Sequence, residues 1–289
     1  MSNVVNESKI FIDIENFVKH VCTSKNIPRN FYNQLSGLIF QLDRIYNSDH
    51  YYVAAIEALV ELLLDLDEYL DDPECLYERL IKISFEDIQR DFKRHYCRHK
   101  RLLRDHRHSE SENTKTLVNR MQRISNKYSR ILVVRVDLAY PLKSQEQIGI
   151  IDFKDDMDVL RTRIRDQDTV FKGLIEYSWA LEQGEDKGYH CHLLLVYKGS
   201  ERRSAYSVAH RVGKLWSEIT EDQGCHFNCH TAAYLKQFSD RNRLGIGMIH
   251  RKNFDQVNNM LNTVKYLVRP EKESQHLRVK TKKRMRTFG

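Results

Sequence analysis

The sequence contains no apolar run of the length that a helix needs to cross a bilayer. Its first residues lack the basic-then-apolar layout of a secretory signal, so we expect a cytoplasmic protein. Six cysteines in 289 residues are too few for a disulfide framework, and we expect mostly reduced thiols. Internal repeats are also missing. These absences argue against a membrane-spanning protein, a disulfide scaffold and a repeat array.

The composition is that of a folded protein with a basic surplus. Hydrophobic residues make up 41% and aromatic residues 10% of the chain, which argues against general disorder. The length permits one large domain or two modest ones. The net charge of +7 suits a polyanionic partner, although a merely soluble basic protein has the same balance.

Residues 1–108 are predicted to form a helical region, either a bundle or an extended hairpin. Apolar residues recur there at helical spacing in two segments, 35–45 and 53–64. The segment 90–107 holds eight Lys or Arg residues against two Asp residues. This segment could track phosphates or could form a solvated helix face. Small polar residues follow it and predict a linker over 109–124.

The second half alternates between strand and helix patterns. The order β-α-β-β-α-β matches the split-βαβ, ferredoxin-like topology, with one further helix at the end. The predicted fold class is therefore α+β, with a helical N-terminal region before a domain at 125–270 that has an antiparallel sheet, and a basic C-terminal tail at 271–289. The expected strands are 131–138, 174–183, 189–197 and 244–250, and the expected helices are 152–167, 204–219 and 254–268.

A candidate metal site lies around a predicted hairpin. His190 and His192 are two residues apart in a strand and therefore point to the same face. Glycines at 184 and 188 bracket a turn, which pairs Glu182 with His190 across the hairpin. Two imidazoles and a carboxylate then converge, which predicts a site for Mg²⁺ or Mn²⁺ with open positions for water or phosphate oxygen. The alternative is that the histidines are structural.

The last predicted helix carries an unusual tyrosine. Tyr266 lies opposite the apolar stripe of that helix and shares its side with Asn259, Asn262 and Arg269. Arg269 is close enough along the helix to approach the same phosphate as Tyr266. On spacing alone, an ordinary surface tyrosine fits this position as well.

These residues suggest a family. Glu182, the His190-x-His192 pair and the later Tyr266-Leu-Val-Arg269 run resemble the HUH endonucleases. More closely, the second half resembles the replication proteins of filamentous (inovirus) phages and their prophage relatives of the YfjJ/YagK type. The strings Gly188–His192 and Arg286–Gly289 contribute to this resemblance. The resemblance covers roughly residues 125–289 and does not extend to the helical half.

The resemblance implies a replication initiator of the rolling-circle type, which nicks and rejoins single-stranded DNA at an origin through a 5′-phosphotyrosine intermediate. Tyr266 matches the nucleophile of the Tyr-x-x-Lys motif, and Arg269 stands at the Lys position. Arg keeps the positive charge but cannot give up its proton. Tyr234 is a weaker second tyrosine. Host replication proteins such as a helicase are possible partners.

Several basic residues are candidates for contacts with DNA phosphates. Arg135 shares a strand face with Asp137, so this pair could bind DNA, support the metal shell or form a simple ion pair. The remaining candidates are Lys265 and the tail residues Arg278, Lys280, Lys282, Lys283, Arg284 and Arg286.

Other interpretations compete with nicking. The Cys225-His226 and Cys229-His230 pairs contain zinc ligand types, but structural zinc draws its ligand pairs from separate elements and no second element is evident. A non-catalytic DNA-binding or regulatory protein of a prophage could use the same basic surface. RNA binding through the sheet is weaker, because the strands lack the interleaved aromatics of an RNA-recognition motif.

Overall fold

A computed structural model of the chain describes residues 6–267 and 275–289. The chain divides into two compact units, each with its own packing. We call them the helical unit, made of Met1–Asp105, Gln145–Ile150 and Leu277–Met285, and the sheet unit, made of His106–Ser144, Ile151–His276 and Arg286–Gly289. In the described part of the chain, no helix has the length and apolar character that a membrane span requires.

The helical unit confirms the helical character predicted for the first hundred residues. Asn6 caps the first helix, because its side chain accepts a hydrogen bond from the backbone N–H of Lys9 at 3.0 Å. Asp72 caps the fourth helix in the same way, and Pro73 occupies its first position, where a missing N–H costs nothing. The elements are α1 (Glu7–Thr23), α2 (Phe31–Asp43), β1 (Tyr51–Tyr52), α3 (Ala54–Asp65), η1 (Asp67–Tyr69), α4 (Pro73–Leu80) and the first part of α5 (Phe85–Lys127).

The predicted linker over 109–124 is wrong. This segment lies inside α5, which is one continuous helix of 43 residues. Its Ser, Glu and Asn residues are only mildly unfavourable in a helix, and the segment contains neither Pro nor Gly to interrupt it. Leu117 and Met121 are fully buried in the sheet unit, so tertiary packing fixes the helical conformation.

The basic tail was predicted over 271–289, and its described residues 275–289 are built into the fold. The strand β7 (Val279–Lys280) pairs antiparallel with β1. The guanidinium group of Arg278 is buried and contacts the carboxylate of Glu15 at 2.6 and 2.7 Å. Glu15 also lies 2.9 Å from His99 of α5. Arg278 is therefore an internal ion-pair partner and not an exposed contact for DNA.

The sheet unit is built on five antiparallel strands, which confirms the α+β class. The strand order is β3-β4-β2-β5, and β6 pairs with the first half of β2. Helix α7 connects β2 to β3, and helix α8 connects β4 to β5. Short elements near residues 142, 225 and 232 were not predicted from the sequence. The strands are β2 (Arg130–Ala139), β3 (Leu174–Gly184), β4 (Gly188–Lys198), β5 (Cys225–Asn228) and β6 (Gly247–His250).

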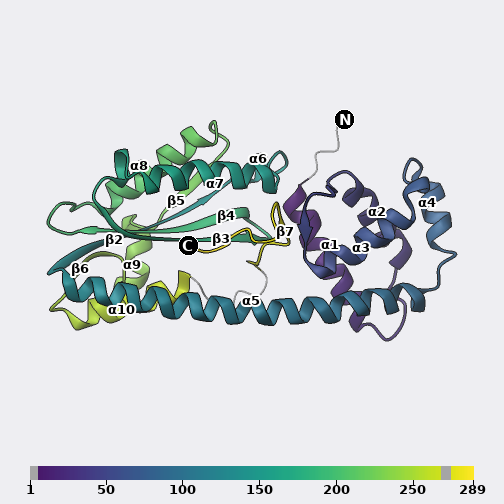
Figure 1. Ribbon diagram of the computed structural model, residues 1–289, viewed down its shortest axis with the longest axis horizontal. Helices are drawn as coiled ribbons and strands as arrows, with labels where there is room; N and C mark the ends of the chain where they lie inside the picture. Colours follow the sequence, from purple (N-terminus) through teal and green to yellow (C-terminus); the bar gives the residue numbers. More distant parts are fainter. Residues whose placement is uncertain (1–5, 268–274) are drawn as a thin grey trace. The chain divides into compact units, whose positions relative to one another are not determined.

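Helices cover both faces of this sheet (Figure 1). On one face lie α7 and α8, and on the other lie the second part of α5 and α10. The outer edge of β3, which no other described strand covers, pairs with the last residues 287–289. There the backbone N–H of Trp179 donates to the carbonyl of Gly289 at 2.8 Å. The remaining elements are α6 (Leu142–Gln145), α7 (Ile150–Arg165), η2 (Thr169–Phe171), α8 (Ala205–Ile219), α9 (Ala232–Ser239) and α10 (Phe254–Leu267).

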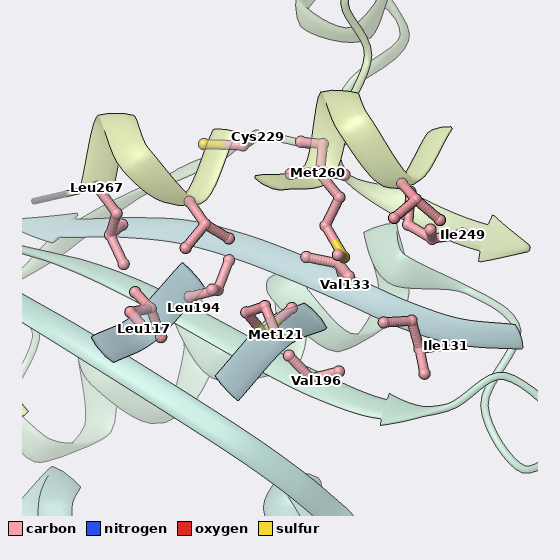
Figure 2. Packing of buried hydrophobic residues seen from close by; sticks show 13 residues of the cluster. Leu117, Met121, Ile131, Val133, Leu194, Val196, Cys229, Ile249, Met260 and Leu267 are labelled. Carbon is pink, nitrogen blue, oxygen red and sulfur yellow. The ribbon is translucent and has the colours of Figure 1, made fainter. Parts of the chain in front are cut away.

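A single apolar cluster fixes α10 and α5 against the sheet (Figure 2). Ile131 and Val133 of β2 and Val196 of β4 point to the same face and contact residues of both helices. Met260 enters this cluster from α10 and is fully buried. The cluster fixes the position of the α10 backbone against the sheet. The side chains on the opposite side of α10 are therefore attached to a backbone that does not move relative to the sheet.

The buried ion pair gives a stability prediction. Replacing Arg278 with Ala leaves the Glu15 carboxylate buried without its guanidinium partner, and should lower the free energy of unfolding by about 3 kcal/mol. The matched control is Arg284→Ala, because Arg284 is an exposed arginine of the same segment. Urea denaturation followed by circular dichroism measures both variants. Equal stability of the two variants would contradict an internal role for Arg278.

Candidate active site

The candidate site begins with the register of the β3–β4 hairpin. Glu182 lies directly opposite His190, and Ala180 lies opposite His192, as the glycine-bracketed turn predicts. Gly188 has a φ of 57°, a left-handed conformation that a glycine adopts at little cost, so the turn closes at this residue. Strand alternation then directs Glu182, His190 and His192 to the same face of the sheet, the face covered by α5 and α10.

These three side chains converge. The Oε2 atom of Glu182 lies 3.3 Å from Nε2 of His190 and 3.3 Å from Nε2 of His192. One ligand atom from each residue lies within 4.8 Å of the other two. Both imidazoles are buried, with 1% and 3% of their surface exposed, so a cation placed among them would be shielded from bulk solvent.

The ring of each histidine is oriented by a contact of its Nδ1 atom. Nδ1 of His190 donates to the carbonyl of Gly188 at 3.0 Å, since a carbonyl can only accept. Nδ1 of His192 lies 2.7 Å from Oδ1 of Asp137, which is its direct neighbour across the β2–β4 ladder. Such outer contacts fix the tautomer and the ring orientation of metal-binding histidines. Both Nε2 atoms face Oε2 of Glu182.

The donor set fits a divalent cation. Two imidazole nitrogens and one carboxylate oxygen suit Mn²⁺ or Mg²⁺, and three protein ligands leave positions for the oxygens of a phosphate. The preformed orientation of the two rings and the burial of all three residues are the features expected of a metal centre.

Arg135 and Asp137 form an ion pair beside this cluster. Nε of Arg135 lies 3.1 Å from Oδ1 of Asp137, and Nη2 lies 3.3 Å from Oδ2. Burial would raise the pKa of Asp137, but its hydrogen bond with His192 and the charge of Arg135 outweigh burial and hold the pKa well below its usual range. Asp137 therefore stays ionised. Of the three roles that the sequence left open for this pair, Asp137 combines two, the ion pair and the support of a candidate metal ligand.

Tyr266 lies near the end of α10, and 48% of its surface is exposed. It lines a pocket of about 520 Å³ on the α10 face of the sheet. Arg135, the ion-pair partner of Asp137, lines the same pocket, whereas Glu182, His190 and His192 are not in its lining. Glu182 lines a separate, smaller pocket together with Leu267 of α10. Tyr234, the second tyrosine candidate, is also in the lining. Arg269 lies outside the described residues.

The other predicted DNA contacts differ in their surroundings. Lys265 is exposed and lines the Tyr266 pocket. Lys280 is part of β7, and burial lowers its pKa. Four residues of the predicted tail are exposed, namely Lys282, Lys283, Arg284 and Arg286. Sequence reasoning missed Phe238 and Arg243 of the pocket, because α9 and the loop after it give no strong periodic signal.

The zinc alternative is not supported by the geometry. Cys225 is exposed at the start of β5, whereas Cys229 is buried in the core beneath α10. His230 accepts a hydrogen bond from the backbone N–H of Arg135 through Nε2 at 3.0 Å. Within residues 6–267 and 275–289, no group of metal ligands includes these residues.

Comparison with known proteins identifies the family. Residues 92–289 match the model of the YagK/YfjJ C-terminal domain, which covers more than half of the chain. The chain therefore belongs to the family of prophage proteins that carry this domain. No curated protein and no solved structure matches the chain.

Metal binding by the candidate cluster can be tested by direct titration. His192→Gln and Glu182→Gln each remove one ligand and should weaken Mn²⁺ binding by at least about tenfold, and Asp137→Asn should weaken it by about 10–100-fold through the ring of His192. The matched control is His210→Gln, at an exposed histidine of α8. Electron paramagnetic resonance of free Mn²⁺ measures the affinity. A His210 variant as weak as the other three would argue against this centre.

His230 provides a pH prediction. Burial lowers the pKa of His230 from its ordinary value of 6.5 to about 4. The unfolded chain therefore binds more protons between these values, and the stability that the neutral ring contributes is lost as the pH falls from 6.5 to 4. The loss amounts to about 3 kcal/mol. In His230→Gln, which keeps a hydrogen-bond acceptor, urea denaturation at both pH values should show a correspondingly smaller acid loss; an unchanged loss would contradict this role.

Proposed function

We propose that this protein nicks and rejoins single-stranded DNA, with Tyr266 as the nucleophile and a divalent cation held by Glu182, His190 and His192. The strand order of the sheet supports this proposal. With β2, β3, β4 and β5 as the four strands of β-α-β-β-α-β, the order β3-β4-β2-β5 is that of a ferredoxin-like sheet. The HUH endonucleases, which the second half of the chain resembles, are built on this topology.

The observation that carries the proposal is the chain of contacts that leads from the Tyr266 pocket to the histidine cluster. Tyr266 and Arg135 line one cavity, and Arg135 contacts Asp137, which in turn holds His192. Tyr266 comes from α10 and the three ligands come from β3 and β4, on the sheet face that α10 covers, and the link between them runs through Arg135 and Asp137.

The reaction is a phosphoryl transfer. The oxygen of Tyr266 attacks the phosphorus of a phosphodiester, a bond forms between them, and the bond from phosphorus to the 3′ oxygen breaks. The phenol loses its proton, and the leaving 3′ oxygen gains one. A bound divalent cation would polarise the phosphate and help to position it. The products are a 5′-phosphotyrosine and a free 3′ hydroxyl.

The covalent product conserves the energy of the phosphodiester. Attack of a 3′ hydroxyl on the 5′-phosphotyrosine reverses the first step and rejoins the strand, and the free 3′ end can prime DNA synthesis in the meantime. This cycle is that of rolling-circle replication at a phage or prophage origin. A host helicase is the partner that such a cycle requires to open the duplex ahead of synthesis.

Substitution of the tyrosine tests the proposal. Tyr266→Phe removes the attacking oxygen and should abolish the covalent adduct with a labelled single-stranded origin DNA in the presence of Mn²⁺. Tyr234→Phe is the matched control, since it removes a hydroxyl from the same pocket and should retain the adduct. A denaturing gel separates the adduct from free DNA.

The two alternatives give different results in this assay. Adduct formation by Tyr266→Phe, with loss of the adduct in Tyr234→Phe, would exchange the roles of the two tyrosines. Binding of DNA without any adduct in the wild-type protein, with Mg²⁺ or Mn²⁺ present, would favour a non-catalytic DNA-binding protein. A chelator added before the DNA should prevent adduct formation by the wild type, because the phosphate then lacks the cation that polarises it.

A further inference from the structure

The Tyr266 pocket contains groups that the nicking reaction does not use. One wall is α10, which contributes Asn259 and Asn262, and the opposite wall is α9 with the loop that leads to β6. The volume of about 520 Å³ is within the range of sites that bind small molecules. The pocket can therefore hold more than the single phosphate that Tyr266 attacks.

The charge of the pocket suits an anion. Its lining includes Arg135, Arg243 and Lys265, and the described lining contains no carboxylate. Arg135 is already engaged by Asp137. Arg243 and Lys265 are exposed and have no ion-pair partner among the described residues, so both cations are available to a ligand phosphate.

Aromatic rings line the α9 side of the pocket. Tyr234 and Phe238 are one helical turn apart, and their ring centroids are separated by 5.0 Å. Phe227 of β5 continues the row at 5.2 Å from Tyr234, and 48% of its surface is exposed. The rings are tilted to one another, by 53° for Tyr234 and Phe238, so a base can stack on one ring while it contacts the next.

Close contacts of the backbone fix the loop wall of the pocket against α10. A Cβ atom at Gly245 would lie 2.2 Å from the carbonyl oxygen of Asn259, so only glycine permits the loop to approach α10 this closely. The amide of Asn259 donates to the carbonyl of Asn242 in that loop at 3.0 Å. Asn262, by contrast, is exposed, and its amide makes no hydrogen bond to the described residues. It is available to the edge of a base.

We propose that this pocket binds one unpaired nucleotide of the DNA strand, adjacent to the phosphate that Tyr266 attacks. The inference rests on the proposed function for its assignment of the strand as DNA. The nucleotide phosphate contacts Arg243 and Lys265, the base stacks on Tyr234 and Phe238, and Asn262 contacts the base edge. A paired base cannot enter, because both of its faces are already stacked in the duplex.

Binding of a fluorescein-labelled single-stranded oligonucleotide of mixed sequence tests the pocket, with a chelator present to prevent cleavage. Arg243→Ala should weaken binding by about tenfold and reduce the slope of log affinity against log salt by about 0.7. The matched control Arg241→Ala removes an exposed arginine two residues away that is not in the lining, and should change affinity less than about twofold. Fluorescence anisotropy measures each affinity.

Phe238→Ala tests stacking separately from charge. It should weaken binding by about tenfold while leaving the salt slope unchanged, since base stacking releases no counterions. Thermal unfolding of this variant verifies that the sheet unit is intact, and Arg243→Ala, at an exposed position, tests the same pocket through its charge without a risk to folding. Equal affinities for the Arg243 and Arg241 variants, or no binding by the wild type, would overturn the pocket assignment.

The failure of this inference is distinguishable from that of the proposed function. If the wild type forms the adduct but the Arg243 and Phe238 variants bind DNA normally, nicking stands and the nucleotide pocket does not. If no adduct forms but both variants lose affinity, the pocket stands and nicking does not. Asn262→Ala should reduce the difference in affinity between oligo(dA) and oligo(dT), and an unchanged difference would remove Asn262 from base contact.

Discussion

The register of the β3–β4 hairpin is the constraint on which the rest of the site depends. Pairing of Glu182 with His190 places the carboxylate and both imidazoles on one face. A slip of one residue would turn Glu182 to the opposite face, toward α7 and α8, and leave the histidines without their carboxylate. The turn at Gly188 fixes this register, and the long antiparallel ladder of β4 with β2 fixes the face to which both histidines point.

The same strand alternation explains why one face of the sheet changes character along its length. In β2 the residues on this face are Ile131 and Val133, followed by Arg135 and Asp137. The corresponding row in β4 changes from valine and leucine to histidine. The apolar half anchors α10 and α5, as Figure 2 shows, and the polar half carries the cluster of ionisable side chains. Anchor and site therefore share two strands, so packing determines the position of the chemistry.

Hydrophobic periodicity and turn residues in the sequence predicted those elements whose conformation depends on neighbouring residues. The strands around the hairpin, the helices of the first half and the Glu182–His190 pairing depend on periodicity and on one turn. The linker prediction failed because Leu117 and Met121 are stabilised by residues far away in the sequence. The burial of Arg278 could not be predicted for the same reason, because its partner Glu15 lies near the other end of the chain. Sequence reasoning found both tyrosines of the pocket but not Phe238 or Arg243, because only the folded loop brings them together.

The path of the last residues has a consequence for how the protein can be divided. The matched family domain starts at residue 92, inside α5, and includes β7. The strand that pairs with β7 and the carboxylate that neutralises Arg278 both precede residue 92. A fragment trimmed to the family boundaries would therefore contain an orphaned strand and an uncompensated guanidinium group. Autonomous folding of this region requires either the preceding helices or redesign of residues 277–285.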